Sequence, residues 1–392
     1  MTPGLIHAIT PGDHFSPRTG SAVPSVVDGL SRAAADPTPL ARVLVATGTY
    51  PDRYASAASV EYSLVEPRRS DRYVDAFLAR LGLPRLAARR VLAAMLREQR
   101  QWEPSIVLAH NLPGLVPLVD VTRHVPVLYA HNQLLRTYSL READRVLGSV
   151  AGIVCVSEFL ADQTRDRLPA RLRDLVHAVP NGVDFAAFDR PRAGRGERLR
   201  VAYVGRVIPE KGVHVLLDAV GRLGRTDLEV TVIGRPGFSA DDPLTSYEEQ
   251  LREQASRLPV SVRFASFVPR PKLPELLAAV DVVAVPSVWP EPFGLTALEG
   301  MAAGKAVIAA DIGGLPEAVG SAGVLVPPGD ADSLAQVLEA LASDNALLDQ
   351  LGTLARDHAR ANDWGTARAR LDRVLGLVLA GGRAGGQPDD LK

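Results

Sequence analysis

The sequence predicts an α/β protein built from two domains, each with a parallel sheet that helices cover on both faces. Short apolar runs rich in β-branched residues alternate with amphipathic helical patterns along the chain, which indicates βαβ units. The length of 392 residues suits two domains rather than one. A Pro-, Gly- and Arg-rich stretch without periodicity, from Asn181 to Glu197, divides the pattern into halves.

Five strands are predicted on each side of this stretch. Those in the first half are Leu5–Ile9, Val43–Ala46, Ile106–Ala109, Val125–Tyr129 and Ile153–Val156. Those in the second half are Arg200–Val204, Glu229–Ile233, Val282–Val285, Ala306–Ala309 and Gly323–Val326. Predicted helices between them include Ala22–Ala35, Ser157–Leu168, Val213–Leu223, Pro274–Ala279 and Ser333–Leu341. Each half is therefore expected to be Rossmann-like, and the two sheets are expected to face each other across a cleft.

The same patterns give provisional domain limits. Residues 1–187 form the expected N-terminal domain and residues 188–362 the C-terminal domain. Residues 363–380 have a helical pattern and are expected to cross back to the first domain. The Gly-rich, polar residues 381–392 are expected to be a flexible tail.

Composition excludes several classes of protein. The chain is 46% hydrophobic and 23% charged with a net charge of -1, which is typical of a globular protein and argues against a nucleic-acid partner. The single cysteine, Cys155, excludes an internal disulfide framework and lies in an apolar run typical of a core. Neither a secretory signal nor an apolar stretch of membrane-spanning length is evident, so we expect a cytoplasmic protein.

The loop Gly205-Arg206-Val-Ile-Pro-Glu-Lys211-Gly212 is a candidate phosphate-binding site. It follows a predicted strand and opens a helix, where free backbone N–H groups favour anions. Arg206 and Lys211 add two cations, and Lys211 is one of only four lysines in the chain. The loop lacks the Gly-Lys-Ser/Thr ending of a Walker phosphate loop. An ordinary solvated surface loop is the alternative interpretation.

The segment Glu291-Pro-Phe-Gly-Leu-Thr-Ala-Leu-Glu299 also follows a predicted strand. Gly294 permits a close turn around a ligand, and Leu295 to Ala303 is predicted to be helical. Carboxylates can accept hydrogen bonds from neighbouring sugar hydroxyls. The alternative is an acid at a helix start, stabilised by the helix dipole, which accounts for Glu291 in part but not for the whole turn.

The first half carries polar residues where its strands end. The segment Gly12-Asp13-His14-Phe15-Ser16-Pro17-Arg18-Thr19-Gly20-Ser21 follows the first strand, and Gly20 could present its N–H to an anion. His110 and His131-Asn132 follow two later strands. Single histidines at strand ends are more often structural than catalytic. Asp330-Ala-Asp332 is interpreted as a helix N-cap rather than a metal site.

These motifs resemble those of the family 4 glycosyltransferases, which have the GT-B fold. The similarity spans both halves of the chain, and its most specific parts are the Arg206/Lys211 loop and the two glutamates Glu291 and Glu299. The motifs that carry it also include the Gly20 loop, Val156-Ser-Glu158, Pro180-Asn-Gly-Val-Asp184, Met301-Ala-Ala-Gly-Lys-Ala-Val307 and Gly313-Gly-Leu-Pro-Glu317. Gly20-Ser21 departs from the pair of glycines that is common in the family.

The resemblance implies retaining transfer of a sugar from a nucleotide-sugar donor, expected to be a UDP-sugar. It places Arg206 and Lys211 on the leaving diphosphate, Glu299 on the ribose, and Glu291 with Phe293, Gly294 and Leu295 on the donor sugar. It also assigns Gly20 to the donor and places His131 beside the reacting carbon. The catalytic set it implies is His131, Glu291, Arg206 and Lys211. No metal or other cofactor is implied.

The first domain is expected to select the acceptor. Asp13, His14, His110 and Asn132 are the candidate residues, and the expected acceptor is a small polar molecule such as an aminocyclitol of bacterial aminoglycoside assembly or another specialised metabolite. A lipid-linked or membrane-surface acceptor is the alternative. It rests on the basic amphipathic segment 84–100, for which packing on the sheet is the favoured interpretation.

Two further classes of protein remain open. One is a nucleotide-sugar epimerase or hydrolase, and the other is a sugar-binding protein without catalysis. The pair of glutamates favours the transferase over the epimerase or hydrolase. The complete set of two cations and two glutamates argues against a site that has lost its activity.

Overall fold

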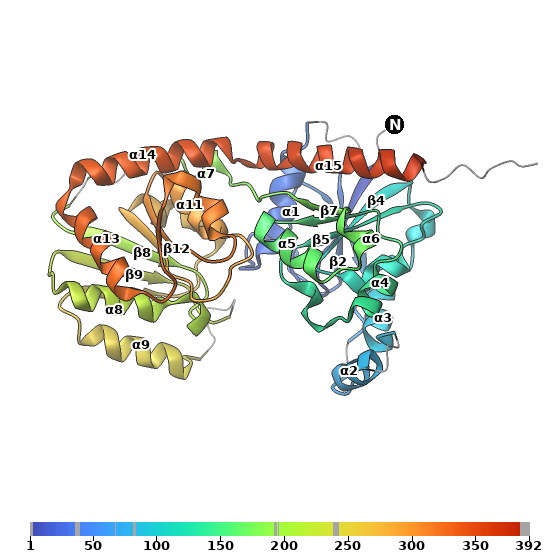
Figure 1. The fold of residues 1–392 in the computed structure, drawn as a ribbon, viewed down its shortest axis with the longest axis horizontal. Helices are drawn as coiled ribbons and strands as arrows, with labels where there is room; N and C mark the ends of the chain where they lie inside the picture. Colours follow the sequence, from blue (N-terminus) through green and yellow to red (C-terminus); the bar gives the residue numbers. More distant parts are fainter. Residues whose placement is uncertain are drawn as a thin grey trace, which may run out of the picture. The chain divides into compact units, whose positions relative to one another are not determined.

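The computed structural model describes residues 3–35, 40–66, 68–80, 84–191, 194, 196–237 and 243–384. The chain divides into two compact units (Figure 1). Unit 1 comprises Met1–Pro180 and Gly365–Lys392, and unit 2 comprises Asn181–Trp364. The first division comes at Pro180 rather than at residue 187, because the short helix α7 (Phe185–Phe188) packs on helices of unit 2.

Unit 1 contains a seven-stranded parallel sheet in the order β3-β2-β1-β4-β5-β6-β7. Its strands are β1 Gly4–Ala8, β2 Arg42–Ala46, β3 Ala58–Tyr62, β4 Ser105–His110, β5 Val125–Ala130, β6 Gly152–Cys155 and β7 Val176–Ala178. The central strands are buried on both faces, with β4 buried at every position. This explains why their sequences are continuous apolar runs rather than alternating patterns.

Unit 2 contains a six-stranded parallel sheet in the order β10-β9-β8-β11-β12-β13. Its strands are β8 Leu199–Val204, β9 Leu228–Ile233, β10 Ser261–Ala265, β11 Val282–Val285, β12 Ala306–Ala310 and β13 Val324–Val326. Both sheets thus contain the doubly wound order 3-2-1-4-5-6, in which the fourth strand is added beside the first. The predicted pair of parallel α/β domains is confirmed.

Helices connect the strands of each unit. In unit 1 they are α1 Ala22–Arg32, α2 Asp71–Arg80, α3 Leu86–Ala93, α4 Leu140–Val146, α5 Glu158–Asp166, α6 Ala170–Arg173 and α15 Trp364–Ala384. In unit 2 they are α7, α8 Val213–Leu223, α9 Ser246–Ser256, α10 Leu273–Ala278, α11 Leu295–Ala302, α12 Leu315–Val319, α13 Ala331–Ser343 and α14 Asn345–Ala361. Short 3-10 helices that matter below are η4 Leu134–Thr137, η5 Pro209–Lys211 and η6 Arg270–Lys272.

The sequence patterns missed three strands, and all three are edges of a sheet. β3 and β7 close the two sides of the unit 1 sheet, and β10 is one edge of the unit 2 sheet. β3 and β10 are largely exposed or half-buried and carry charged residues, Glu61 and Arg263. An edge strand that is only partly buried does not need a continuous apolar run, so it lacks the signal by which the buried strands are found.

Helix α15 belongs with unit 1. Arg368 donates a hydrogen bond to the carbonyl of Leu30 at 3.0 Å. Val378 packs so closely on Gly152 that a Cβ there would lie 2.6 Å from the valine side chain. Gly381–Ala384 continue the helix, and the rest of the expected tail lies outside the described residues.

The segment 84–100 packs on unit 1 with most of its large apolar side chains, and of these only Leu86 is exposed. Leu92, Met95 and Leu96 are buried in the core beside β1, β2 and β4. Cys155 is likewise buried, as predicted. Among the described residues, no helix combines the length and apolar character that crossing a membrane would require.

Candidate active site

The two sheets each have one topological switch point, where loops from adjacent strands leave in opposite directions. In unit 1 it lies between β1 and β4, and in unit 2 between β8 and β11. Ligands of open α/β sheets bind outside the carboxyl ends of the strands at such a point. The residues singled out from sequence lie there in both units. His110 is the last residue of β4 and the Gly12–Ser21 loop follows β1, while Lys211 and Glu291 follow β8 and β11.

Lys211 and Glu291 form an ion pair across the switch point of unit 2. The Lys211 ammonium donates to Glu291 Oε1 at 2.6 Å. The hydroxyl of Ser287 donates to the same oxygen at 2.6 Å. Glu291 is buried and Lys211 is partly exposed. The carboxylate is therefore held by two donors on one oxygen, and the lysine keeps donor capacity toward a further anion.

Two glycines permit the close backbone packing that creates this pair. Gly212 has φ +72°, and a Cβ on it would lie 1.9 Å from the carbonyl oxygen of Pro286. Gly313 has φ +67°, and a Cβ on it would lie 2.4 Å from the carbonyl oxygen of Glu291. The backbone N–H of Gly314 donates to that same carbonyl at 2.7 Å. Any side chain at these glycines would force the loops apart.

Glu299, in helix α11, forms a second ion pair in unit 2. Its carboxylate accepts a short hydrogen bond from Arg270 of η6. Burial raises the pKa of Glu299 above its usual range, and the Arg270 guanidinium opposes this rise. The arginine thus favours the charged carboxylate that a ribose contact would use.

The other expected donor residues of unit 2 lie in the loop after β8 and in the turn before α11. Arg206 is exposed, and its carbonyl accepts a hydrogen bond of 2.6 Å from Tyr203 Oη, which fixes the loop after β8. Phe293 is buried and anchors the turn before α11. Gly294 has φ +119° and precedes Leu295, the first residue of α11. Within the described part of the chain no side chain caps this helix, so its first N–H groups remain available to a ligand.

Three histidines of unit 1 lie in series. His7 Nδ1 is 2.9 Å from His110 Nε2, and His110 Nδ1 is 2.8 Å from His131 Nε2. His7 and His110 are completely buried. Both nitrogens of His110 are engaged, so this residue has no route to direct contact with an acceptor and must act, if at all, through His131. Asn111 holds the histidine backbone by accepting from the His131 N–H at 2.7 Å.

The loop after β1 is ordered by its own polar groups. The hydroxyl of Ser21 contacts Asp13 at 3.4 Å instead of capping α1. Burial raises the pKa of Asp13, and the Ser21 hydrogen bond partly offsets the rise. His14 Nδ1 accepts from the backbone N–H of Tyr50 at 2.9 Å, with the two rings stacked. Gly20 is exposed just before the uncapped start of α1.

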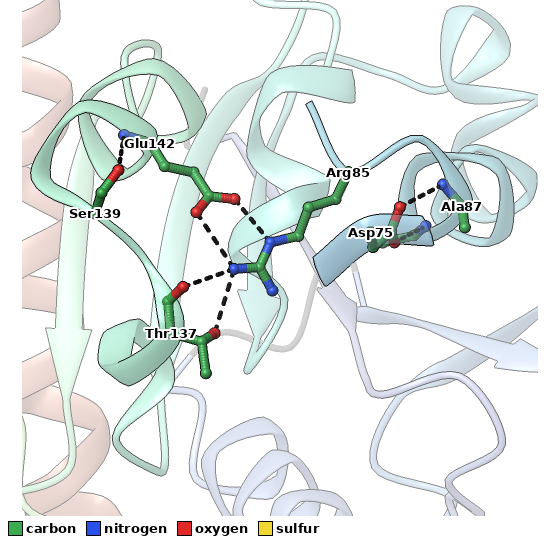
Figure 2. Close-up of polar contacts among 7 residues, drawn as sticks. Asp75, Arg85, Ala87, Thr137, Ser139 and Glu142 are labelled. Carbon is green, nitrogen blue, oxygen red and sulfur yellow. Dashed lines mark hydrogen bonds and ion pairs between the residues drawn. The ribbon is translucent and has the colours of Figure 1, made fainter. Parts of the chain in front are cut away.

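The loop after β5 is anchored by Arg85, as Figure 2 shows. The Arg85 guanidinium donates to Glu142 at 2.7 Å and to the carbonyl of Thr137 at 2.9 Å. It also lies over the Tyr138 ring at 4.2 Å. Asn132 is exposed at the start of this loop. Arg85 belongs to the basic segment 84–100, and its partner is the buried carboxylate of Glu142.

Sequence patterns missed three residues that contact the predicted ones: His7, Arg270 and Ser287. His7 lies inside an apolar strand, so its alignment with two later histidines depends on strand order. Asp330 caps α13 by accepting from two backbone N–H groups at 3.0 Å, as predicted. In the described part of the chain, no group of three or more metal-ligating side chains is placed to hold an ion.

The amino-acid sequence is similar to those of known glycosyltransferases. The model of Glycosyltransferase Family 4 matches residues 26–187, and that of Glycosyl transferases group 1 matches residues 185–358. The D-inositol 3-phosphate glycosyltransferase of Kribbella flavida is 38% identical over 311 residues, covering 69% of this chain and 71% of that protein. The chain belongs to the glycosyltransferases of this family.

A second relative of the glycosyltransferase is the phosphatidyl-myo-inositol mannosyltransferase of Mycolicibacterium smegmatis, 34% identical over 291 residues, which cover 69% of this chain and 70% of that protein. Solved structures show the same GT-B fold. The Anabaena protein HepE, in complex with UDP and glucose, has a TM-score of 0.71 at 20% identity and covers 95% of this chain and 99% of its own. The α,α-trehalose 6-phosphate synthase of Burkholderia multivorans has a TM-score of 0.74 at 17% identity, and the superposition covers 97% of this chain and 100% of that protein's chain.

Proposed function

We propose that this glycosyltransferase acts in the cytoplasm and transfers a sugar from a UDP-sugar to a hydroxyl of a small polar acceptor, with retention at the anomeric carbon. The observation that carries the proposal is the Lys211–Glu291–Ser287 cluster at the switch point of unit 2, next to the Glu299–Arg270 pair. Fixed cations can bind the donor's diphosphate, and fixed carboxylates can accept hydrogen bonds from the hydroxyls of its ribose and of its transferred sugar. HepE, which shares the fold, was solved in complex with UDP and glucose, and this supports the same type of donor here.

In the proposed mechanism the donor's glycosidic bond to phosphate breaks while the acceptor oxygen bonds to the same carbon from the same face. The acceptor hydroxyl proton passes to the leaving phosphate oxygen. Lys211 has three N–H groups and spends one on Glu291, so two can contact the diphosphate. Arg206 adds the second positive charge. The enzyme then acts by positioning and by stabilising developing charge, with no metal required.

The carboxylates orient the donor. Glu291 Oε1 already accepts from Ser287 and Lys211, which leaves Oε2 for a hydroxyl of the transferred sugar. Glu299 accepts from the ribose hydroxyls. His131 provides a polar contact for the sugar at the end of β5. Gly20 offers its backbone N–H at the uncapped start of α1.

The acceptor is proposed to be a cyclitol, neutral or carrying an amino group. The two relatives described above are both named for inositol, which is a cyclitol. Asp13, in the loop after β1, brings a carboxyl group that suits a cationic or neutral acceptor better than a phosphorylated one. His14 and Asn132 contribute hydrogen-bonding groups from neighbouring loops. The lack of a phosphate group, with or without an added amino group, distinguishes this acceptor from the phosphorylated inositol for which the first relative is named.

A lipid-linked acceptor is a second candidate, because unit 1 carries an exposed apolar face on α2. Tyr73 and Phe77 are 63% and 62% exposed, and Val74 lies beside them. Figure 1 shows α2 projecting from the unit 1 sheet. Asp75 caps α3 through the N–H groups of Ala87 and Ala88, at 2.9 and 2.8 Å, which holds α2 against α3. Exposed aromatic rings among arginines suit an anionic lipid surface.

Product analysis with a radiolabelled UDP-sugar tests the reaction type. Incubation with an aminocyclitol, inositol or inositol 3-phosphate should move the label to the acceptor, with the linkage keeping the donor's anomeric configuration. Release of free sugar independent of acceptor would identify a hydrolase. Label remaining on an epimerised nucleotide sugar would identify an epimerase. A nucleotide that raises the melting temperature without turnover would identify a binding protein.

Acceptor choice is tested by two variants. Asp13→Asn should reduce transfer to the aminocyclitol more than transfer to inositol, because it removes the negative charge. Tyr73→Ser combined with Phe77→Ser should leave transfer to small acceptors unchanged. If wild-type protein floats with phosphatidylserine vesicles and the double variant does not, the membrane-surface candidate replaces the small-molecule one.

A further inference from the structure

The histidine series in unit 1 extends beyond the single residue that the proposed function uses. His7, His110 and His131 come from β1, β4 and β5, which are neighbours in the sheet. Their rings are stacked at 5.1 Å between centroids for each successive pair. The two N···N contacts of 2.9 and 2.8 Å are hydrogen bonds, so each requires one N–H and one lone pair.

All three rings are neutral near physiological pH. Burial lowers the pKa of His7 and of His131 to about 3, and burial and the neighbouring histidines lower that of His110 well below its usual value. The Arg368 guanidinium from α15 adds to the effect on His7. A neutral imidazole has one N–H and one lone pair. His110 must therefore accept through one nitrogen if it donates through the other. Both hydrogen bonds of the series consequently run in the same direction, either from His7 to His131 or from His131 to His7.

The buried end of the series decides its direction. His7 Nε2 is buried and has no hydrogen-bond partner among the described residues. If His131 donated to His110 and His110 donated to His7, the Nδ1 of His7 would be the acceptor and its proton would be on Nε2. That nitrogen would then carry an unpaired buried N–H, an arrangement that is rare in native proteins. The positive charge of Arg368 also disfavours a proton there. With a bare Nε2, His7 donates through Nδ1 to His110, and His110 donates through Nδ1 to His131.

We propose that His7 and His110 are positioning residues that fix His131 as the Nδ1–H tautomer, so that His131 presents a neutral hydrogen-bond donor to the substrate and cannot act as a base. His131 Nε2 is occupied by His110, so Nδ1 is the nitrogen left for the substrate. The contact of His131 with the substrate rests on the proposed function. The tautomer itself does not, because it follows from bonds within unit 1.

Nitrogen-15 NMR of the histidine rings tests the tautomer directly. The chain has eight histidines, so the His131 signals are assigned from a His131→Asn variant. In the wild-type protein we expect a protonated, pyrrole-type Nδ1 and a bare, pyridine-type Nε2 on His131 from pH 6 to 8. A protonated Nε2 overturns the inference, whether or not the protein transfers sugar. Loss of transfer with the expected tautomer would count against the proposed function alone.

Variants of the buried end test the positioning role. His7→Leu removes the first donor, so His131 should show mixed tautomers and kcat should fall about tenfold, the value of one hydrogen bond. The KM for the donor should change less than kcat. His7→Asn supplies an amide N–H near the position of Nδ1 and should restore both the tautomer and most of kcat.

His177→Leu is the matched control, since His177 lies on β7 outside the series. It should leave the His131 signals and kcat unchanged. If His7→Leu folds and leaves the tautomer unchanged, the positioning role is wrong. If His7→Leu fails to fold, the wild-type spectrum and the His7→Asn variant still decide the question.

Discussion

The two switch points of this glycosyltransferase use opposite electrostatics. In unit 2 the candidate residues are charged and paired, Lys211 with Glu291 and Arg270 with Glu299. In unit 1 three buried neutral histidines lie in series instead. A fixed cation suits a diphosphate and a carboxylate accepts from hydroxyl groups, whereas a neutral imidazole can donate to a hydroxyl oxygen without adding charge. The same strand order thus supports two kinds of chemistry, because different polar side chains stand at or near the carboxyl ends of the strands in the two units.

The largest expected effect concerns the charge of unit 2. Lys211→Ala should reduce kcat/KM by a factor that corresponds to about 2–4 kcal/mol, because the leaving diphosphate loses a fixed cation. The variant should also be less stable, since the Glu291 carboxylate is buried and loses a partner. Steady-state kinetics and thermal unfolding measure the two effects.

A double variant separates the loss of turnover from the loss of stability. Lys211→Ala combined with Glu291→Gln should regain stability without regaining turnover. Lys272→Ala removes an exposed lysine and is the control for a generic charge effect. Near-normal kcat/KM in folded Lys211→Ala would refute the assignment of Lys211 to the diphosphate.

The neutral histidines of unit 1 predict acid sensitivity. A histidine whose folded pKa is about 3 and unfolded pKa is 6.5 binds fewer protons when folded across that range. Stability should therefore fall as pH falls below 6.5, by about 1.4 kcal/mol per pH unit for one histidine, or about 2 kcal/mol at pH 5. The ring of Tyr129 lies beside His110 and His131, and burial raises its pKa well above the ordinary value, so it stays protonated over this range. The other charged group that acts on the series is the Arg368 guanidinium, beside His7.

Denaturant unfolding at pH 7.5 and pH 5 measures this loss. In His7→Asn the loss should be about 2 kcal/mol smaller than in the wild type, because one titrating group is gone. An identical pH dependence in the two proteins would show that His7 is not held neutral.

The Arg270–Glu299 pair should show the opposite pH dependence. Arg270→Ala removes the group that opposes the raised pKa of Glu299, so the folded carboxyl should bind its proton more tightly. A carboxyl whose folded pKa is raised loses stability as pH rises through its unfolded value. The variant should therefore lose about 1–2 kcal/mol relative to wild type at pH 7.5 and less at pH 4.5.

Thermal unfolding at the two pH values gives this difference. Arg270→Ala combined with Glu299→Gln should abolish it, since no charge is left to compensate. A loss that is equal at both pH values would mean that Arg270 acts only through packing.

The smallest expected effect is that of chelation. If Arg206 and Lys211 supply the positive charge as proposed, transfer should continue unchanged after exhaustive treatment with EDTA. A loss of activity that only magnesium or manganese restores would show that the charged residues of unit 2 are insufficient for the diphosphate.

Local patterns in the sequence were enough to predict the central strands, helix α8 with both its ends, and the loops that carry Lys211, Glu291 and Glu299. These features depend on neighbours a few residues apart: apolar runs, helical periodicity, and glycines at turns. The edge strands β3 and β10 were not predicted, because a partly buried strand can contain polar residues and so lacks a continuous apolar run.

The pairings required the tertiary structure. Lys211 and Glu291 are 80 positions apart, and His7 and His110 are 103 apart. Each pair meets because the fourth strand of the sheet is added beside the first. Lys211 and Glu291 lie in the loops after two such neighbouring strands, whereas His7 and His110 lie on the paired strands β1 and β4 themselves. His7 inside a strand gives no local sign of a partner, and His110 at a strand end suggests exposure. By sequence alone the chain determined which polar residues stand at the ends of its strands. The strand order decided which of them touch, and therefore which are charged, which are neutral and which are buried.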